Sequence, residues 1–130
     1  MSSLKPIFTV TVALSMLVAA PCYSEDWERV SSDTEANKVY YDLDSIESNA
    51  QGVYVWIMVD FSTSVMGVFS KKSHVQMDCD KKTYRIHQEI LFESSFGSGE
   101  AYVTDVITAK IIPVAKDQGL VNVMNGVCAL

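Results

Sequence analysis

The sequence predicts an α+β protein in which a small antiparallel β-sheet of about five to six strands carries a C-terminal helix on one face. Several short runs alternate apolar with polar residues and are separated by turn residues, which is typical of half-buried strands. Near the C-terminus the spacing changes, and apolar residues recur every three or four positions, which indicates an amphipathic helix.

The first 24 residues have the composition of a secretory signal peptide. Lys5 is their only charged residue, and it precedes an apolar run of 14 residues at 7–20. A membrane-spanning helix needs about 18 or more apolar residues, so this run is too short to span. Its terminal position and flanks favour a leader cleaved after Ser24 over a buried core helix. Residues 25–130 then form a single domain.

A second interpretation makes Cys22 the lipid-bearing first residue of a lipoprotein. Ala19 and Ala20 have the small side chains that such a processing site requires, but Pro21, directly before the cysteine, does not fit. A membrane contact is expected only if Cys22 is lipidated.

Cys79 and Cys128 remain after removal of the leader. In an oxidising compartment this even pair predicts one disulfide, and two buried free thiols are the alternative. The bridge would close a loop of about 50 residues, for which the chain-entropy model gives about 4 kcal/mol of stabilisation. The two cysteines lack the paired spacing of a zinc site.

The composition is acidic. The whole chain has a net charge of −6, and without Lys5 its 9 basic and 16 acidic side chains give −7. Binding of nucleic acid depends on a basic face, so this balance speaks against a nucleic-acid partner.

The strongest strand signal lies at 53–61, which is apolar on both faces. Further strands are expected at 27–30, 38–42 and 101–113, whereas 62–72 is either a strand fragment or a loop. Asp117 is predicted to cap a C-terminal helix that begins at Gln118. Two glycines, Gly119 and Gly126, weaken this helix, so packing must hold it in place.

A hairpin is predicted at 73–92. If Lys81 and Lys82 are its two loop residues, two pairs of opposite charge face each other across the strands: Asp78 with Arg85, and His74 with Glu89. Lys-Lys is not the usual turn chemistry, so a longer loop that includes Asp80 is the alternative.

Four aromatic residues form the predicted binding patch: Tyr54, Trp56, Phe69 and Phe96. Tyr54 and Trp56 share the second face of the strand at 53–61, where core packing is the alternative because large aromatic side chains are usually buried. Phe69 belongs to the apolar segment 65–69, and Phe96 lies in the Gly/Ser loop at 94–100.

The chain has no recognised catalytic, phosphate-binding or dinucleotide motif. His74 and His87 lie near Glu89 in the predicted hairpin and suggest zinc, but exposed histidine pairs more often have no such role. Asp60 is the one acid singled out for a hydrolase. We therefore expect no enzyme activity, no cofactor and no metal.

Several segments together resemble the bacterial surface-adhesin protein E family. In chain order they are Trp27, VYYDLDSI at 39–46, VYVWIMVDF at 53–61, Ser70-Lys71, QMDCDKKTYRI at 76–86, Phe96-Gly97 before Gly99, Pro113 and Val127-Cys128. The resemblance implies a helix packed on an antiparallel sheet, a disulfide, and an exported protein that binds host matrix or serum proteins. The tryptophan that the family usually has at 101–112 is missing here.

These observations predict an exported, non-enzymatic binding module, adhesin-like and located in the periplasm or at the cell surface. Its expected partner is a protein, either extracellular from a host or from the bacterial envelope. The alternative is a structural or accessory component of a periplasmic envelope complex, which would dock through a sheet edge and the segment 65–69.

The intact mass of the protein exported by a bacterial host tests the leader. We expect a chain that begins at Glu25 and gains alkyl groups on two thiols only after reduction, because Cys22 is then absent. A mass that includes lipid on Cys22 would contradict cleavage after Ser24.

Overall fold

The computed structural model describes residues 25–30, 32–105 and 109–130. In this part of the chain, β1, β2, β4, β5, β6 and β7 lie side by side in that order in one sheet, while β3 also pairs with β4 and β8 with β6. Every pairing is antiparallel. The strands are β1 (Trp27–Arg29), β2 (Lys38–Asp42), β3 (Glu47–Asn49), β4 (Gly52–Val65), β5 (Val68–Asp78), β6 (Thr83–Ser94), β7 (Ser98–Asp105) and β8 (Ile112–Pro113).

The sheet therefore has eight strands, and the prediction of five to six is too low. The sequence pattern missed β3, a three-residue strand with no apolar alternation. It also treated 101–113 as one strand, whereas the structure has two, β7 and β8. The two pair with different parts of β6, β7 with 88–94 and β8 with 83–84.

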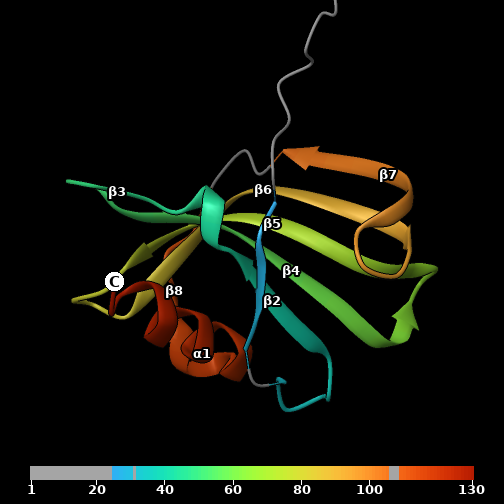
Figure 1. Cartoon of the computed structure of the whole chain (residues 1–130), viewed down its shortest axis with the longest axis horizontal. Helices are drawn as coiled ribbons and strands as arrows, with labels where there is room; N and C mark the ends of the chain where they lie inside the picture. The colour runs from blue at the N-terminus through green and yellow to red at the C-terminus, as the bar shows by residue number, and fades with distance from the viewer. Residues whose placement is uncertain (1–24, 31, 106–108) are drawn as a thin grey trace, which may run out of the picture.

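One α-helix, α1 (Gln118–Val127), packs against one face of the sheet, as predicted (Figure 1). Asp117 caps it, because its carboxylate accepts the backbone N–H of Leu120 at 3.3 Å. Two short 3₁₀ helices complete the fold, η1 (Leu43–Ser45) and η2 (Val114–Lys116).

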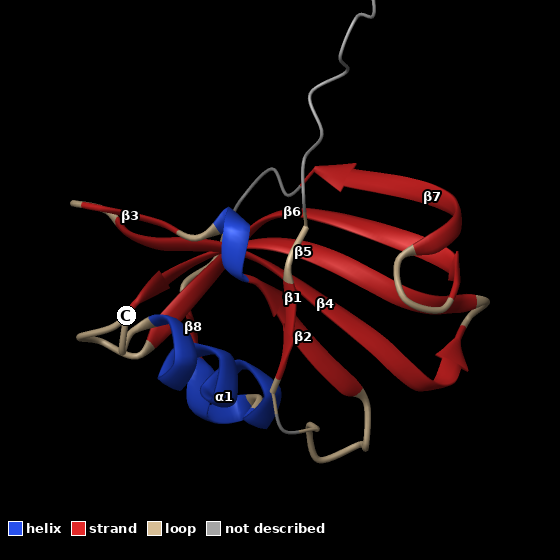
Figure 2. Ribbon diagram, viewed as in Figure 1, coloured by secondary structure: helices blue, strands red, loops and turns tan. Residues whose placement is uncertain are grey.

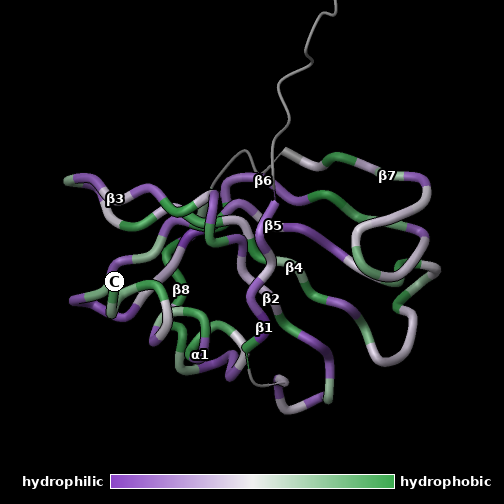
Figure 3. The backbone as a smooth tube through the Cα atoms, viewed as in Figure 1, coloured by the Kyte–Doolittle hydropathy of each residue, from purple (hydrophilic) through white to green (hydrophobic). Residues whose placement is uncertain are grey.

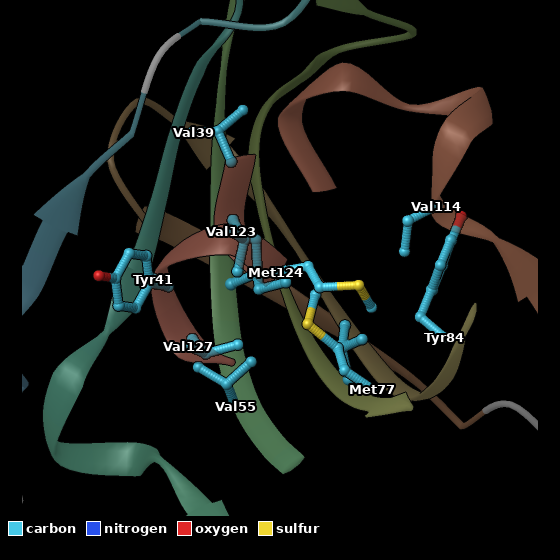
Figure 4. Close-up of a cluster of buried hydrophobic side chains, with 11 residues drawn as sticks. Val39, Tyr41, Val55, Met77, Tyr84, Val114, Val123, Met124 and Val127 are labelled. Atoms are coloured by element: carbon cyan, nitrogen blue, oxygen red, sulfur yellow. The ribbon is translucent and has the colours of Figure 1, made fainter. Parts of the chain in front are cut away.

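The hydrophobic core lies between α1 and the sheet (Figure 4). Val123, Met124 and Val127 of α1 are buried against alternate residues of the central strands, such as Val55 and Met77. The same alternation is visible along the chain in Figure 3, where apolar and polar segments succeed each other in the strands. Only one sheet face contributes to this core.

Gly119 and Gly126 allow α1 to approach β2 closely. A Cβ atom on Gly119 would lie 2.9 Å from Cγ2 of Val39, and one on Gly126 would lie 2.9 Å from the hydroxyl oxygen of Tyr41. Both distances are shorter than a normal van der Waals contact. The two residues that weaken the isolated helix are thus the ones that fit it to the sheet.

The predicted disulfide is present between Cys79 and Cys128, with a Cα–Cα distance of 5.9 Å. Cys79 follows β5 and Cys128 follows α1, so the bridge ties the end of the helix to the β5–β6 turn. Figure 1 shows the C-terminus beside this turn.

The predicted register of the β5–β6 hairpin is wrong. Asp78 faces Thr83 and Arg85 faces Gln76, because the loop has four residues, 79–82, instead of two. This agrees with the longer-loop alternative. The carboxylate of Asp78 accepts the backbone N–H groups of Asp80 and Lys81 at 3.1 and 3.0 Å, which stabilises the longer turn.

A β-bulge at His87 changes the register again further along the hairpin. Val75 pairs with Ile86 but His74 pairs with Gln88, so one residue of β6 is inserted between them. Glu89 therefore faces Ser73 on the helix-covered side, and its predicted pairing with His74 is wrong.

The segment 62–72 is strand on both sides of a tight turn. β4 extends to Val65 and β5 begins at Val68, with Met66 and Gly67 between them. Both turn residues have positive φ, 51° and 81°, as a two-residue type I′ hairpin requires.

Removal of the disulfide should lower the free energy of unfolding by about 2–5 kcal/mol. The double substitution Cys79→Ser with Cys128→Ser frees the end of α1 in the unfolded chain and so increases the entropy of that state. Urea unfolding of the oxidised protein and the double variant measures the difference, with the reduced wild-type protein as the control. Equal midpoints would contradict a stabilising bridge.

Candidate functional site

The two faces of the sheet are covered differently. The face that carries Val55 and Val75 is closed by α1, and within residues 25–30, 32–105 and 109–130 no α-helix lies on the other (Figure 2). Because successive side chains of a strand point to opposite faces, Trp56 and His74 lie on this second face, which we call the open face.

A groove of about 510 Å³ lies on the open face. Aromatic, apolar and charged side chains from β1 to β6 line it: Glu25, Trp27, Asp42, Asp44, Ser45, Glu47, Trp56, Lys72, His74, Ile90 and Phe92. Its volume is in the range of pockets that bind small ligands. The groove is thus assembled from segments far apart in the sequence.

Four rings form a continuous cluster at one end of the groove. The ring of Trp56 stacks on His74 with a centroid distance of 5.0 Å and an interplanar angle of 19°. Tyr54 lies 5.9 Å from both His74 and His87, and the two imidazoles are 6.4 Å apart. This cluster presents flat apolar ring surfaces beside polar ring nitrogens.

Hydrogen bonding determines the orientation of His87. The side-chain amide nitrogen of Gln76 donates to the backbone carbonyl of Gln51 at 2.7 Å, so the amide oxygen of Gln76 is the acceptor for its other partner. Nε2 of His87 donates to that oxygen at 2.8 Å. This hydrogen bond places a proton on Nε2.

The pKa of His74 is lowered from its usual value. Partial burial in the ring cluster disfavours the charged imidazolium, and the neighbouring His87 acts in the same direction. The carboxylate of Glu47 opposes both effects but does not outweigh them. His74 is thus kept neutral at neutral pH.

Lys72 lies in a cage of rings at the other end of the groove. Its ammonium nitrogen is 5.2 Å from the ring centroid of Trp27 and 5.4 Å from that of Phe92, within the range of a cation–π contact. It also pairs with Glu25 at 3.2 Å. Its side chain is only 15% exposed, so the charge lies inside the groove instead of in bulk water.

The turn between β6 and β7 folds back over the open face beyond the groove. The backbone N–H of Phe96 donates to the carboxylate of Asp60 at 3.0 Å, and that of Gly97 donates to the Ser70 hydroxyl at 2.8 Å. The ring of Phe96 meets Tyr40 edge to face at 5.1 Å. Asp60 thus holds this turn in place.

The structure brings together part of the predicted binding patch. Tyr54 and Trp56 lie in the ring cluster, and Phe96 is on the same face beyond the groove. Phe69 is not part of this surface, because alternation along β5 places it on the opposite face, where it is 42% exposed. Cys22 is outside the described residues.

Sequence analysis missed most other residues of the groove, among them Trp27, Lys72 and Phe92. Alternation along β5 could have placed Lys72 with His74, since the two are separated by two positions. Trp27 had no such signal, because its position depends on the pairing of β1 with β2. For Phe92, the bulge at His87 reverses the face that alternation along β6 would assign.

The histidine pair was predicted to lie near Glu89. The two rings do lie together, but Glu89 is on the helix-covered side and approaches Lys71 at 4.0 Å. Across residues 25–30, 32–105 and 109–130, no three His, Cys, Asp or Glu side chains gather as metal ligands would. Within the same residues, no helix is long and apolar enough to cross a membrane.

The substitution His74→Gln should reduce the dependence of stability on pH between about pH 7.5 and pH 5. The folded pKa of His74 lies below its unfolded value of about 6.5, so folding disfavours the charged ring. The contribution of neutral His74 to the free energy of unfolding is therefore fully present above about pH 6.5, and it is lost as the pH falls through the folded pKa. Urea unfolding at both pH values measures the loss of stability between them. An equal loss in the wild-type protein and the variant would contradict this role of His74.

Comparison with known proteins agrees with this architecture. The family model described as surface-adhesin protein E matches residues 27–129. Two solved structures of Haemophilus influenzae protein E are similar in fold. Crystal form II has a TM-score of 0.63 at 16% identity, covering 79% of this chain and 87% of that one.

A second structure of the same Haemophilus influenzae protein has a TM-score of 0.61 at 15% identity, covering 79% of this chain and 83% of that one. No curated protein sequence matches the chain. The family match extends over most of the chain and includes every strand and helix of the fold. The chain therefore belongs to the surface-adhesin protein E family.

Proposed function

We propose that this chain is an exported, non-enzymatic binding module with an adhesin-like role, which binds a host matrix or serum protein through the open face. The observation that carries this proposal is the groove of about 510 Å³ on that face, lined by rings and charged side chains. Membership of the surface-adhesin protein E family supports it.

The chemistry of the groove suits protein recognition. Tryptophan and tyrosine are enriched at the centres of protein interfaces, where a ring supplies a large contact area at little entropic cost. Trp27, Trp56 and Tyr54 are partly exposed on the open face, whereas the opposite face is occupied by α1. A partner that covers the rings would remove apolar surface from water.

Export is part of the proposal. The pattern of residues 1–24 supports a cleaved leader, and family membership supports an exported protein. We place the domain in the periplasm or at the cell surface, with a membrane tether only if Cys22 carries lipid.

The substitution Trp56→Ala should weaken binding to the partner by about thirtyfold, the effect of losing a contact worth 2 kcal/mol. Surface plasmon resonance against a panel of matrix and serum proteins would first identify the partner and then measure the variant. Phe69→Ala is the matched control, because it also removes an exposed ring but from the opposite face.

Near-UV circular dichroism, and an intact mass that shows the Cys79–Cys128 disulfide still formed, would establish that both variants are folded. Trp56→Phe is a milder variant that keeps most of the packing of the ring. The proposal fails if no protein of the panel binds, or if Phe69→Ala weakens binding as much as Trp56→Ala does.

A second candidate function is an accessory role in a periplasmic envelope complex. The tip of the β4–β5 hairpin favours it, since Val65 is 53% and Met66 99% exposed there. A photo-crosslinking residue at position 66 that captured no envelope protein in cells would remove this candidate.

A further inference from the structure

We propose that the groove takes a segment of the partner protein in which a lysine or arginine is flanked by apolar side chains. The inference deepens the proposed function and rests on it, because it assigns the chemistry that the open face selects. Three features carry it: the charge of the groove, the cation already inside it, and the shape of its lining.

The groove has a strong excess of negative charge. Four carboxylate side chains line it, from Glu25, Asp42, Asp44 and Glu47, against one ammonium side chain, that of Lys72. That ammonium is already paired with Glu25. In the described part of the chain, neither lysine nor arginine forms an ion pair with Glu47, which lies at the exposed rim. The rim therefore attracts a positively charged segment.

Not every carboxylate of the groove is available to a partner. The Asp42 side chain is buried and accepts the backbone N–H groups of Asp26 and Asp44 at 2.9 and 3.0 Å. It stabilises the turn that leads into η1. Glu47 is exposed at the rim, so its charge is the one that we expect to meet a partner.

Lys72 demonstrates that the groove accommodates a cation. Its ammonium lies between the rings of Trp27 and Phe92 and against the Glu25 carboxylate, with little exposure to water. The two rings offer electron-rich faces, and the carboxylate supplies the opposite charge. At the other end of the groove, the stacked Trp56 and His74 rings lie close to the carboxylate of Glu47.

The apolar part of the specificity comes from the same lining. Ile90 and Phe92 lie two positions apart on β6 and so face the groove together with Trp56. Aliphatic carbons of a long basic side chain, or a neighbouring apolar residue, would pack on these side chains while the charge reaches the rim. An acidic segment would instead place a like charge against Glu47.

Two fluorescent peptides test the inference, one in which lysine alternates with leucine and tyrosine, and one with glutamate in place of every lysine. In fluorescence anisotropy at low salt, the wild-type protein should bind the basic peptide at least about tenfold more tightly than the acidic peptide. The affinity should fall as salt is raised, since exposed charges are screened.

The substitution Glu47→Lys should lower the affinity for the basic peptide by about five- to tenfold and reduce the salt dependence of that affinity. Asp80→Lys is the matched control, because it makes the same change of charge at an exposed turn residue outside the groove. It should change the affinity less than about twofold, as expected for a charge away from the contact. Trp56→Ala should lower the affinity for the basic peptide as well.

The outcomes separate this inference from the proposed function. If a panel protein binds through Trp56 but both peptides bind equally, or Asp80→Lys acts like Glu47→Lys, the selection of basic segments is overturned and the binding function stands. A second outcome is that no panel protein binds, while the basic peptide binds and the Glu47→Lys, Asp80→Lys and Trp56→Ala variants change its affinity as expected. The inference about the groove then stands and the host-protein function fails. If neither a panel protein nor the basic peptide binds, the proposed function and the inference about the groove are both overturned.

Discussion

The packing of α1 on one face of the sheet is the constraint on which the rest of this structure depends. The helix carries two glycines and is only ten residues long, so it is weak as an isolated element. It is held by Val123, Met124 and Val127 against the sheet, by the Asp117 cap and by the disulfide at its end. The hydrophobic core forms only where these contacts bring helix and sheet together.

Because α1 packs on one face, the open face is covered only by side chains of the strands, by η1 and by the β6–β7 turn within the described residues. There the apolar surface is divided among rings, and polar groups are paired locally, as with Lys72 and Glu25 or His87 and Gln76. Such a surface is stable in water yet keeps exposed ring area. The asymmetry between a closed face and an open face leaves room for a groove on a sheet of this size.

Alternation, capping and the cysteine pair could be predicted from the sequence because each is a local property or follows from composition. The faces of Tyr54 and Trp56, the cap at Asp117 and the Cys79–Cys128 bridge are examples. The hairpin register could not be predicted, since Asp78 hydrogen-bonds within its own turn instead of pairing with Arg85. Phe69 lies apart from the other residues of the predicted patch, because alternation along β5 places it on the opposite face.

The sequence by itself determined the class of fold, the family and the residues able to form strands, because period-two alternation and the order of segments are written in the chain. Only the tertiary structure decided which side chains meet. The bulge at His87 and the pairing of β1 with β2 bring Trp27, Lys72 and Phe92 to one groove. The register of the β5–β6 hairpin depends on the four-residue turn that Asp78 stabilises and on the bulge at His87, neither of which the alternation of apolar residues specifies.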